Sequence, residues 1–490
     1  MATLHNIYVA MLQNIYGIIL LLNILLAITV IFLERRNASS TWAWILVLFF
    51  LPIAGFVMYL ILGQKLRKRK LNKLLGVNHR IIEETMEQQK NLLRQRGMRF
   101  NDPEIGQYQD MIYMNLVASY ALYTNDNVVD IYTLGEEKFD ALIRDIEAAQ
   151  HHIHLVYYII RDDDLGRRLV NALTLKAAQG VKVKFLYDHI GSSKLPGRFF
   201  RKLRKAGGEI AAFFPSRIPY LNLKINYRNH RKLAIIDGKI GYIGGFNVGN
   251  EYLGLNKRFG EWRDTHLRVR GSGVLQMQAQ FIMDWNLASP GKFVISEQYF
   301  PFDSRQSGTI GMQLVASGPD TEYQQIKNAY IKMIYAAEKT ICLQTPYFIP
   351  DESLMTALRI AAMSGVEVSI MLPSKPDHFF VYWATHSYLG ELLAGGVKCY
   401  LYKRGFLHAK TLVIDGKLAS VGTANMDIRS FKLNFEMNAF IYDIPTAMKL
   451  KSLFEEDITY SILLTKEMYE ARPLLNRFKE SICRLLSPIL

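Results

Sequence analysis

Two uncharged and almost wholly apolar stretches lie near the amino terminus, at residues 15–33 and 41–62. Each is about as long as the hydrocarbon core of a bilayer requires, and a polar loop of residues 34–40 separates them. Pro52 and Gly55 would weaken a helix in water, but a neighbouring helix absorbs their cost in lipid. The pattern therefore predicts a transmembrane hairpin of two helices.

The charges that flank these stretches predict their orientation. Six Lys or Arg residues lie between residues 65 and 73, the loop carries two Arg and one Glu, and no Lys or Arg precedes the first stretch. Because cytoplasmic flanks of membrane spans are rich in Lys and Arg, we expect the chain from residue 65 onward on the cytoplasmic side. The alternative is a cleaved secretory signal, which would need a basic start and a small-residue cleavage site.

Beyond the hairpin, the apolar pattern alternates between helix and strand, and it does so twice. Residues 146–155 and 334–344 are both typical of a helix end followed by a strand. Residues 177–188 resemble residues 361–373, with a helix, a Gly where it stops, and a strand of alternating Val and aliphatic residues. This repeat predicts an α/β fold class with two units, each a sheet covered by helices. The expected segments are the hairpin with its basic flank at 1–73, a helical linker at 74–115, and domains at 116–300 and 301–490.

Composition narrows the class of partner. Half of the 490 residues are apolar and 21% are charged, which indicates a packed protein rather than a disordered one. The net charge of +15 favours a polyanionic partner, either nucleic acid or an anionic lipid surface. Cys342, Cys399 and Cys483 are too few and too far apart for a disulfide framework or a C-x-x-C zinc site, which fits a reducing compartment.

Each predicted unit carries the same short signature. The first copy is His230-Arg231-Lys232, then Asp237, then Gly244-Gly245-Phe246-Asn247, and the second is His408-Ala409-Lys410, then Asp415, then Gly422-Thr423-Ala424-Asn425. One H-x-K-x4-D match would be weak evidence, but two copies that each place G-x-x-N at the same distance are strong.

The spacing predicts how the signature folds. Residues two apart share one face of a strand, so the His and Lys of each motif point the same way. Asp237-Gly238 and Asp415-Gly416 are two-residue hairpin signals, which would set His230 beside Gly245, with Asn247 close, and His408 beside Thr423. Each hairpin then gathers an imidazole, an ammonium and an amide, groups that can attack phosphorus, move a proton and stabilise phosphate charge.

The paired motifs resemble the defining pattern of the phospholipase D superfamily, and within it the chain is most similar to the bacterial cardiolipin synthases. The similarity covers nearly the whole chain and includes ERRNASSTWAW (34–44), TPYFIPD (345–351), GTANMDIRSFKLNFEMN (422–438) and RLLSPIL (484–490). The small hydroxyl residue that this family places after the first Gly of G-S-x-N is Gly245 in one motif and Thr423 in the other. The two motifs therefore need not have equal roles.

The resemblance implies two phospholipase D-like α/β/α sandwich domains related by a pseudo-two-fold axis, with one active site between them. In this family an acidic residue downstream of each motif orients the histidine of the opposite motif, which here pairs Asp264 with His408 and Glu436 with His230. The candidate catalytic residues are His230, Lys232, Asp237, His408, Lys410 and Asp415, of which Asp237 and Asp415 are expected to support the hairpins rather than touch substrate. The candidate supporting or phosphate-binding residues are Asn247, Asn425, Thr423, Asp264 and Glu436.

The implied reaction joins two phosphatidylglycerol molecules into cardiolipin and glycerol through a phosphohistidine on His230, with His408 as acid and then base. The choice of His230 as nucleophile rests on analogy. No metal or cofactor is implied, because the Lys and Asn side chains supply the positive environment. The expected partners are phosphatidylglycerol and anionic membrane lipid rather than nucleic acid, in a bacterial plasma membrane, with a homo-oligomer left open.

Two other functions stay open at this stage. The same histidines could pass the phosphatidyl group to water or another alcohol, or cleave nucleic-acid phosphodiesters, although a membrane hairpin argues against a nuclease. A non-catalytic scaffold that senses anionic lipid is the third possibility. The motifs alone do not separate transfer from hydrolysis, because the outcome depends on exclusion of water.

Three further patterns have simpler explanations. His151, His152 and His154 are expected to be structural rather than metal ligands, because no acidic residue pairs with them. The basic run from Lys194 to Lys205 is either a solvated helix face or a docking surface for anionic headgroups. The aromatic stretch at residues 379–383 is expected in the core, with contact to acyl chains as the alternative.

Overall fold

The computed structural model describes residues 2–32, 38–59, 79–215, 226–289, 293, 296–301, 308–321 and 323–488. The chain forms two compact units, Met1–Arg67 with Phe214–Tyr227, and Lys68–Phe213 with Arg228–Leu490. The basic segment at 65–73, the ends of both predicted spans (33 and 60–62) and residues 34–37 of the loop lie outside the described residues.

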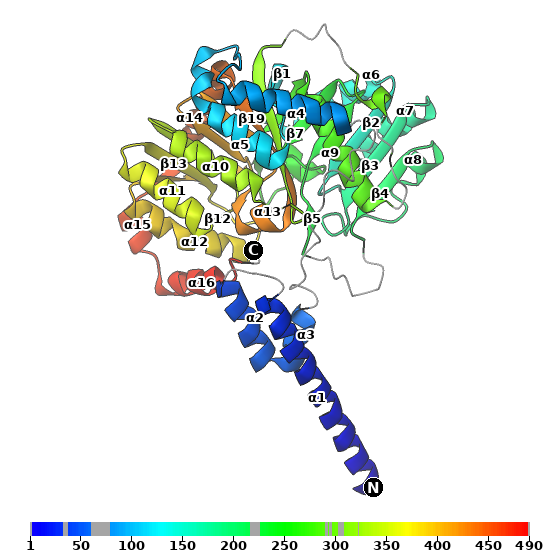
Figure 1. The fold of residues 1–490 in the computed structure, drawn as a ribbon, viewed down its shortest axis with the longest axis vertical. Coiled ribbons are helices and arrows are strands. Elements are labelled where there is room, and N and C mark those ends of the chain that lie inside the picture. The colour runs from blue at the N-terminus through cyan, green and yellow to red at the C-terminus, as the bar shows by residue number, and fades with distance from the viewer. Residues whose placement is uncertain are drawn as a thin grey trace. The chain divides into compact units, whose positions relative to one another are not determined.

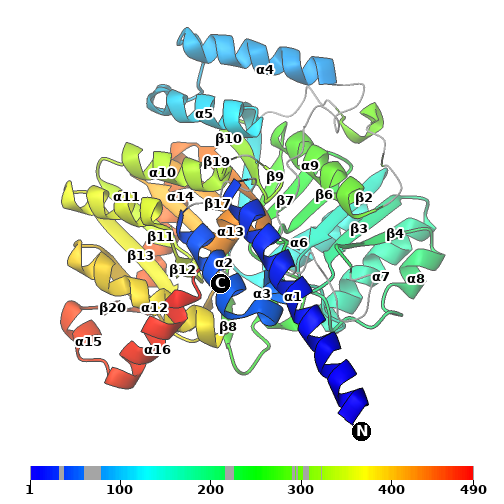
Figure 2. The same cartoon turned by 60° about the horizontal axis from the view of Figure 1, so that its bottom comes forward.

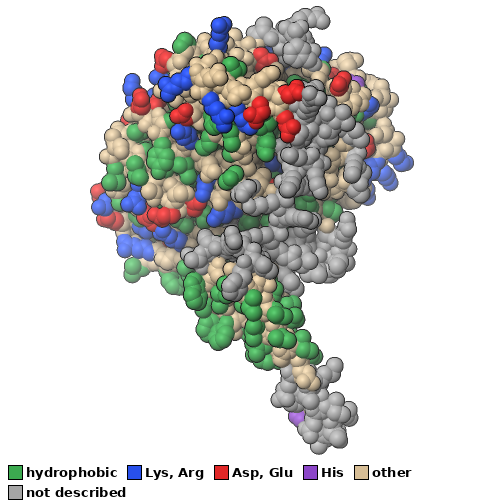
Figure 3. All heavy atoms as spheres, viewed as in Figure 1, with side chains coloured by type: hydrophobic (Ala, Val, Ile, Leu, Met, Phe, Trp, Pro, Cys, Tyr) green, Lys and Arg blue, Asp and Glu red, His purple; other side chains and the backbone are tan. Residues whose placement is uncertain are grey.

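The first unit contains helices α1 (Ala2–Phe32), α2 (Ala38–Phe50) and α3 (Pro52–Met58). The continuous helix predicted over residues 41–62 is interrupted at Leu51, because the residue before a proline is disfavoured in the helical region. The buried side-chain amide of Asn23 in α1 donates to the carbonyl oxygens of Leu48 (3.3 Å) and Pro52 (2.8 Å) at this interruption. The side chains of this unit that Figure 3 colours are largely hydrophobic. No helix among the described residues is both long and apolar enough to cross a membrane.

The second unit is built on one sheet of 16 strands. Its first half contains α4 (His79–Arg94), α5 (Gln109–Ser119), β1 (Thr124–Tyr132), α6 (Gly135–Ala148), β2 (His152–Tyr157), α7 (Asp164–Ala178), β3 (Lys182–Asp188), α8 (Arg201–Lys205), β4 (Glu209–Phe213), β5 (Arg228–Asn229), β6 (Leu233–Ile236), β7 (Ile240–Gly244), β8 (Glu261–Arg263), β9 (His266–Arg270) and α9 (Gly273–Ala288). Short 3-10 helices occupy Pro103–Tyr108, Asn250–Leu253 and Glu297–Tyr299.

The second half of this unit repeats the pattern and adds a helical carboxyl end. It contains β10 (Ile310–Ser317), α10 (Gln325–Ala336), β11 (Thr340–Gln344), β12 (Phe348–Ile349), α11 (Glu352–Met363), β13 (Glu367–Pro373), α12 (Phe379–Ala394), β14 (Lys398–Tyr402), β15 (Gly405–Leu407), β16 (Thr411–Ile414), β17 (Leu418–Gly422), β18 (Met426–Asp427), α13 (Ile428–Lys432), β19 (Asn434–Tyr442), α14 (Ile444–Thr459), β20 (Ser461–Leu464), α15 (Lys466–Glu470) and α16 (Leu474–Leu485).

The strand order is the same when it is followed outward in either direction from the centre of the sheet, except that the second half adds β20 at its edge. The order is β20-β14-β13-β11-β16-β17-β19-β10-β1-β9-β7-β6-β2-β3-β4, and the central pair, β1 and β10, is antiparallel (Figures 1 and 2). In each half, three strands run parallel and the motif hairpin joins the first of them antiparallel. This arrangement contains the repeat predicted from the sequence, in a mixed α/β fold.

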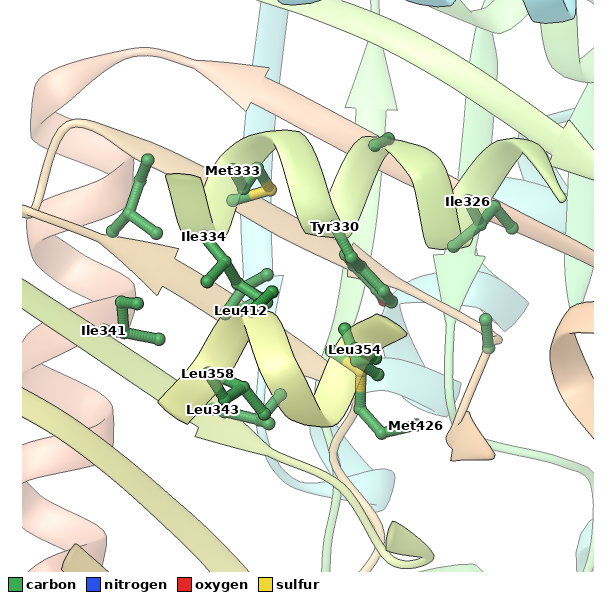
Figure 4. Close-up of a cluster of buried hydrophobic side chains, with 14 of the residues drawn as sticks. Ile326, Tyr330, Met333, Ile334, Ile341, Leu343, Leu354, Leu358, Leu412 and Met426 are labelled. Carbon is green, nitrogen blue, oxygen red and sulfur yellow. The ribbon is translucent and has the colours of Figure 1, made fainter. Parts of the chain in front are cut away.

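Helices cover both faces of the sheet. In the first half, α6 and α7 contribute to one buried apolar cluster, whereas α9 contacts the same strands from outside that cluster. In the second half, α10 and α11 share a cluster and α14 contacts the strands from outside it. Figure 4 shows the second cluster, in which Tyr330 and Ile334 of α10 lie near Leu354 and Leu358 of α11 and near Leu412 of the sheet. Burial of each such aliphatic side chain contributes about 1.5–3 kcal/mol to the free energy of folding.

The linker predicted at 74–115 contains α4, a 3-10 helix and most of α5, with irregular structure at residues 95–102, and it packs against the second half. Helix α5 and the 3-10 helix before it bury Ile105, Tyr108, Met111, Ile112 and Leu116 in the same cluster as α10 and α11. Residues 74–78 lie outside the described residues. The boundaries near residues 115 and 300 stay predictions.

The motif hairpins differ in register from the prediction. The ladder pairs Ile236 with Ile240, so three residues rather than two stand outside it. Asp237 and Gly238 have positive φ angles of 54° and 66°, and the N–H of Lys239 closes the turn onto Ile236. The second hairpin repeats this geometry. The extra residue shifts each returning strand by one position, so the predicted placements of His230 beside Gly245 and His408 beside Thr423 are wrong.

The aspartates of the two motifs are structural groups at these turns. Asp237 accepts hydrogen bonds from the N–H groups of Gln150, His151 and His152 at 2.7–2.9 Å. Asp415 does the same for residues 338–340 at 2.7–2.9 Å. Each turn is thereby fixed to the start of the parallel strand beside it, at the opposite end from the motif histidine. The role expected for them as supports fits this geometry, whereas their inclusion among catalytic candidates does not.

Candidate active site

Both motif histidines lie where the two halves of the second unit meet. Strand β5 of the first half pairs in parallel with β19 of the second, and the next N–H, that of His230, donates to the carbonyl oxygen of Phe435 (3.0 Å). Strand β15 of the second half pairs with β8 of the first, and the N–H of His408 donates to the carbonyl oxygen of Arg263 (2.7 Å). Residues 230–232 and 408–410 therefore precede strands β6 and β16, rather than belonging to them as predicted.

Each imidazole is paired with a carboxylate from the opposite half. His230 Nδ1 lies 2.8 Å from Glu436 Oε1, and His408 Nδ1 lies 2.6 Å from Asp264 Oδ2. These are the two pairings expected from the resemblance. Both carboxylates are fully buried, whereas the histidines keep 8% and 7% of their surface exposed. Because the carboxylate holds each Nδ1 as a donor, Nε2 is the ring nitrogen with a free lone pair.

The two motif lysines have equivalent places. Lys232 Nζ donates to the backbone oxygen of His230 (2.7 Å), and Lys410 Nζ donates to that of His408 (2.6 Å). Burial lowers the pKa of Lys232 to about 7 and that of Lys410 to about 8. Each ammonium also lowers the pKa of the other half's histidine, so the four groups share one electrostatic environment.

Burial lowers the pKa of both histidines, and the lysines lower it further against the opposing effect of the carboxylates. Burial alone would raise the pKa of Asp264 and Glu436, but the neighbouring histidine and lysine groups lower it overall. The resting site therefore holds two carboxylates, two neutral imidazoles and two readily deprotonated ammonium groups. Such a set can attack a phosphodiester, transfer protons and bind its negative charge.

The two carboxylates are held differently. Thr423 Oγ1 donates to Glu436 Oε2 at 2.6 Å. The equivalent residue of the first motif is Gly245, where an added Cβ would lie 2.0 Å from Asp264 Oδ1. The first motif therefore lacks a hydroxyl because the shorter carboxylate occupies the space that a side chain would need. The Thr–Glu and Gly–Asp combinations each deliver one carboxylate to one imidazole.

The two motif asparagines have unequal surroundings. Asn247 Oδ1 accepts the N–H of Ile159 (3.0 Å) and its Nδ2 donates to Tyr252 (3.3 Å), so its amide supports the backbone beside the site. The buried side-chain oxygen of Asn425 has no partner within the described part of the chain.

Two aromatic residues that sequence reasoning missed line the histidines. The Tyr158 ring centroid lies 4.8 Å from that of His230 and 5.5 Å from Lys232 Nζ. The Trp262 ring centroid lies 5.1 Å from that of His408. The sequence gives little signal for either residue, apart from their positions at a strand end and two residues before Asp264.

Two buried ion pairs fix the backbone behind the site. Arg231 contacts Asp284 at 2.5 Å and donates to the backbone oxygen of Glu436. Arg263, which precedes Asp264, contacts Asp457 of the other half at 2.8 Å. Arg231 and Arg263, each next to a catalytic candidate, are thus held in place by buried ion pairs, and breaking such a pair would leave a buried charge without a partner.

The other histidine cluster has a structural explanation. His152 Nε2 and His154 Nδ1 both lie 3.1 Å from Gln278 Oε1, and His154 stacks on Phe281. The two rings share one face of β2, as alternation predicts. No group of three metal-ligating side chains is present among the residues that the structure describes.

Known proteins share these features. A family profile described as "Cardiolipin synthase, PLD-like domain" matches residues 142–262 and 330–458, and one described as "Phospholipase_D-nuclease N-terminal" matches residues 21–64. The chain is 55% identical over 474 residues to a cardiolipin synthase of Listeria monocytogenes (strain F2365), covering 96% of this chain and 98% of the relative. It is 54% identical over 471 residues to the major cardiolipin synthase ClsA of Bacillus subtilis, with the same coverage.

A solved structure shares the fold at much lower sequence similarity. The phosphatidylserine synthase of Haemophilus influenzae superposes with a TM-score of 0.60 at 14% identity, covering 78% of this chain and all of that one. The matched profile spans both motif hairpins and Glu436, and its first matched segment ends two residues before Asp264. The relatives match over nearly their full length. The chain therefore belongs to the cardiolipin synthase family of phospholipase D-like phosphatidyltransferases.

Proposed function

We propose that the protein makes cardiolipin by transferring a phosphatidyl group from one phosphatidylglycerol to the glycerol hydroxyl of another. The observation that carries this proposal is the pair of imidazoles at one seam, each oriented by a carboxylate from the opposite half. Two such groups are what a double displacement needs, because one attacks phosphorus while the other moves the proton.

In the proposed first step, His230 Nε2 attacks the phosphorus and the bond to the departing glycerol breaks, with His408 giving that oxygen its proton. In the second step, His408 takes the proton from a hydroxyl of the second phosphatidylglycerol, whose oxygen displaces His230 from phosphorus. Lys232 and Lys410 stabilise the charge on the phosphate oxygens. Lys410 Nζ lies 3.1 Å from His408 Nδ1 and 3.2 Å from its Nε2, so the ammonium is close to both ring nitrogens.

His408 becomes able to hold the proton for the first step when the substrate binds. Both imidazoles are neutral in the free protein because burial lowers their pKa. A phosphodiester anion placed between them raises the pKa of both, which allows His408 to carry the proton that the leaving glycerol needs. The near-complete burial of the site excludes water from the intermediate and favours transfer over hydrolysis.

The test of this function uses the full chain in mixed micelles with phosphatidylglycerol as sole phospholipid and a chelator present. Mass analysis is expected to find cardiolipin and glycerol in equal amounts. In a separate measurement, a substrate with a chiral phosphorus is expected to react with retention of configuration, because two in-line displacements occur. His230→Ala and His408→Ala are expected to lower kcat by about 10⁴-fold or more. Both are also expected to lower the unfolding midpoint, because each leaves a buried carboxylate without its imidazole partner. Phosphatidic acid as the only product would instead indicate a hydrolase.

Gly245→Ala is expected to lower kcat by about 10²-fold, because its Cβ displaces the Asp264 carboxylate from His408. The matched variant Thr423→Ala keeps the space at the equivalent position and removes one hydrogen bond to Glu436, so its kcat is expected to fall only about tenfold. Steady-state kinetics on both variants check this order. Full activity of Gly245→Ala would contradict the placement of Asp264.

The logarithm of kcat/KM is expected to fall as pH rises through 7 to 8. The phosphate-binding lysines must be ammonium ions, and their lowered pKa values of about 7 and 8 mean that they lose that charge in this range in the free protein. Lys232→Arg keeps its charge and is expected to move the alkaline limb upward. A wild-type profile that stays flat to pH 9 would contradict the lowered values.

We also propose that residues 15–33 and 41–62 anchor the protein in a bacterial plasma membrane, with the second unit on the cytoplasmic side. The support is the lack of charge in both stretches, the basic residues at 65–73, and the buried contact from Asn23 to the helix interruption before Pro52. Polar contacts of this kind satisfy backbone groups that a proline frees in lipid.

Cysteine accessibility in whole cells tests this topology. A cysteine at loop position 37 (Asn37→Cys) is expected to react with a membrane-impermeant maleimide from outside. The exposed position 88 (Gln88→Cys) is expected to react only after lysis. Labelling of position 88 in intact cells would exclude the proposed orientation.

A further inference from the structure

Helix α16 presents its apolar side chains away from the rest of the second unit. Leu474, Leu475, Phe478, Ile482 and Leu485 are each 46–79% exposed and fall within an arc of about 100° on the helix. A surface helix ordinarily turns such an arc toward the core. An apolar arc that faces outward indicates a second apolar environment outside the protein.

Polar contacts on the opposite side fix this orientation. Glu480 is buried and pairs with Arg472 at 2.8 Å, and Arg484 contacts Glu391 of α12 at 2.5 Å. Ser487, just beyond the helix, accepts a hydrogen bond from Tyr388 (2.9 Å). Rolling the helix to bury its apolar arc would break these contacts, so the exposed arc is a built feature.

Helix α12 lies beside α16 and adds two exposed apolar residues. Lys479 lies over the Trp383 ring (5.0 Å) and Ser487 meets Tyr388, so α12 and α16 run parallel with their first turns at the same end. Phe379 and Phe380 begin α12 and are more than half exposed. The expectation that these two phenylalanines lie in the core is therefore wrong. We call Phe379, Phe380 and the five exposed apolar residues of α16 the α12–α16 face.

This face adjoins the active site. Asp377, two residues before α12, accepts a hydrogen bond from Tyr347, and its charge is one of those that raise the pKa of Lys410. Its backbone oxygen also accepts from Arg258 of the first half. The first turn of α12 therefore begins two residues from a carboxylate that acts electrostatically on Lys410.

We propose that the α12–α16 face inserts into the acyl-chain boundary of an anionic bilayer and holds the active site near the membrane surface, an inference that rests on the proposed function. An interfacial helix combines an apolar arc with cations beside it, and Arg477 and Lys479 of α16 flank its arc. The other two charged residues of α16, Glu480 and Arg484, each have an ion-pair partner. The two flanking cations attract anionic headgroups. A phospholipid then reaches the histidines with its headgroup while its acyl chains stay in the bilayer.

A nitroxide label on Phe478→Cys tests the proposal in the full chain reconstituted in phosphatidylglycerol vesicles. Cys342, Cys399 and Cys483 are buried, so the introduced thiol is labelled selectively. The label is expected to collide more with oxygen, which concentrates in lipid, than with a water-soluble nickel chelate. The matched control is Leu175→Cys on α7, an apolar position that is 65% exposed outside the face, where the nickel chelate is expected to dominate.

Two results would overturn the proposal. A label at position 478 that remains open to nickel in vesicles means that the face stays in water. A label shielded from both reagents means that protein covers the face, either the chain's own first unit or a second copy, and light scattering separates these two.

Kinetics of a paired variant give an independent readout. Leu475→Glu with Phe478→Glu is expected to raise KM for vesicle phosphatidylglycerol about tenfold with little change in kcat, because it weakens docking and leaves the histidines intact. Met363→Glu, at an exposed apolar position on α11, is the control and is expected to leave KM unchanged. An unchanged KM in the paired variant would overturn the proposal. Loss of transfer in the wild-type protein would overturn the proposed function instead, whatever the label reports.

Discussion

The structure of the second unit depends on an exchange of carboxylates between its halves. Glu436 and Asp264 are fully buried, and a buried carboxylate is costly without a partner. Each finds that partner, a motif imidazole, only across the seam. Each carboxylate also accepts a hydrogen bond within its own half, Glu436 from Thr423 and Asp264 from the Thr265 N–H. Neither half, however, supplies the imidazole for its own acidic residue, so the docking of the halves completes both pairs.

The backbone around this exchange is fixed by a second repeated device. Helices α9 and α14 each carry an F-x-x-D sequence, Phe281 to Asp284 and Phe454 to Asp457, and each Asp holds an Arg adjacent to a site residue. Arg231 follows one histidine, whereas Arg263 precedes the carboxylate of the other. Both halves thus contain a buried Arg–Asp ion pair behind the site. In one pair the Arg is next to a histidine, and in the other the Arg is next to a carboxylate residue. The halves also differ in how each carboxylate is held, by Gly245 with Asp264 and by Thr423 with Glu436. The two halves therefore share one topology but differ in the residues around the site.

The features that could be predicted from the sequence are those that follow from the periodicity of apolar residues, the spacing of the motifs and the resemblance to a known family. The helix–strand repeats appear in the structure, and the resemblance anticipates both His–carboxylate pairings. Three structural features could not be predicted from the sequence because they depend on tertiary contacts. The hairpin register includes one more residue than the Asp-Gly signal implies, and Asp237 in that turn is tied to the start of β2. The cross-half bridges place the motif histidines before their strands, and the exposure of Phe379 depends on how α12 lies beside α16.

The electrostatics of the free site favour an anionic ligand. Burial disfavours charge, so the lysines hold their protons weakly and the imidazoles are neutral with one proton each, while the two carboxylates stay ionised. A phosphodiester that enters this environment strengthens proton binding at all four basic groups at once. Lys232 and Lys410 then become firm cations and His408 becomes an acid, in the same step that brings phosphorus to His230. The substrate thus converts a nearly neutral resting site into one able to transfer a proton, and the free protein avoids burying two imidazolium charges beyond those that its two carboxylates compensate.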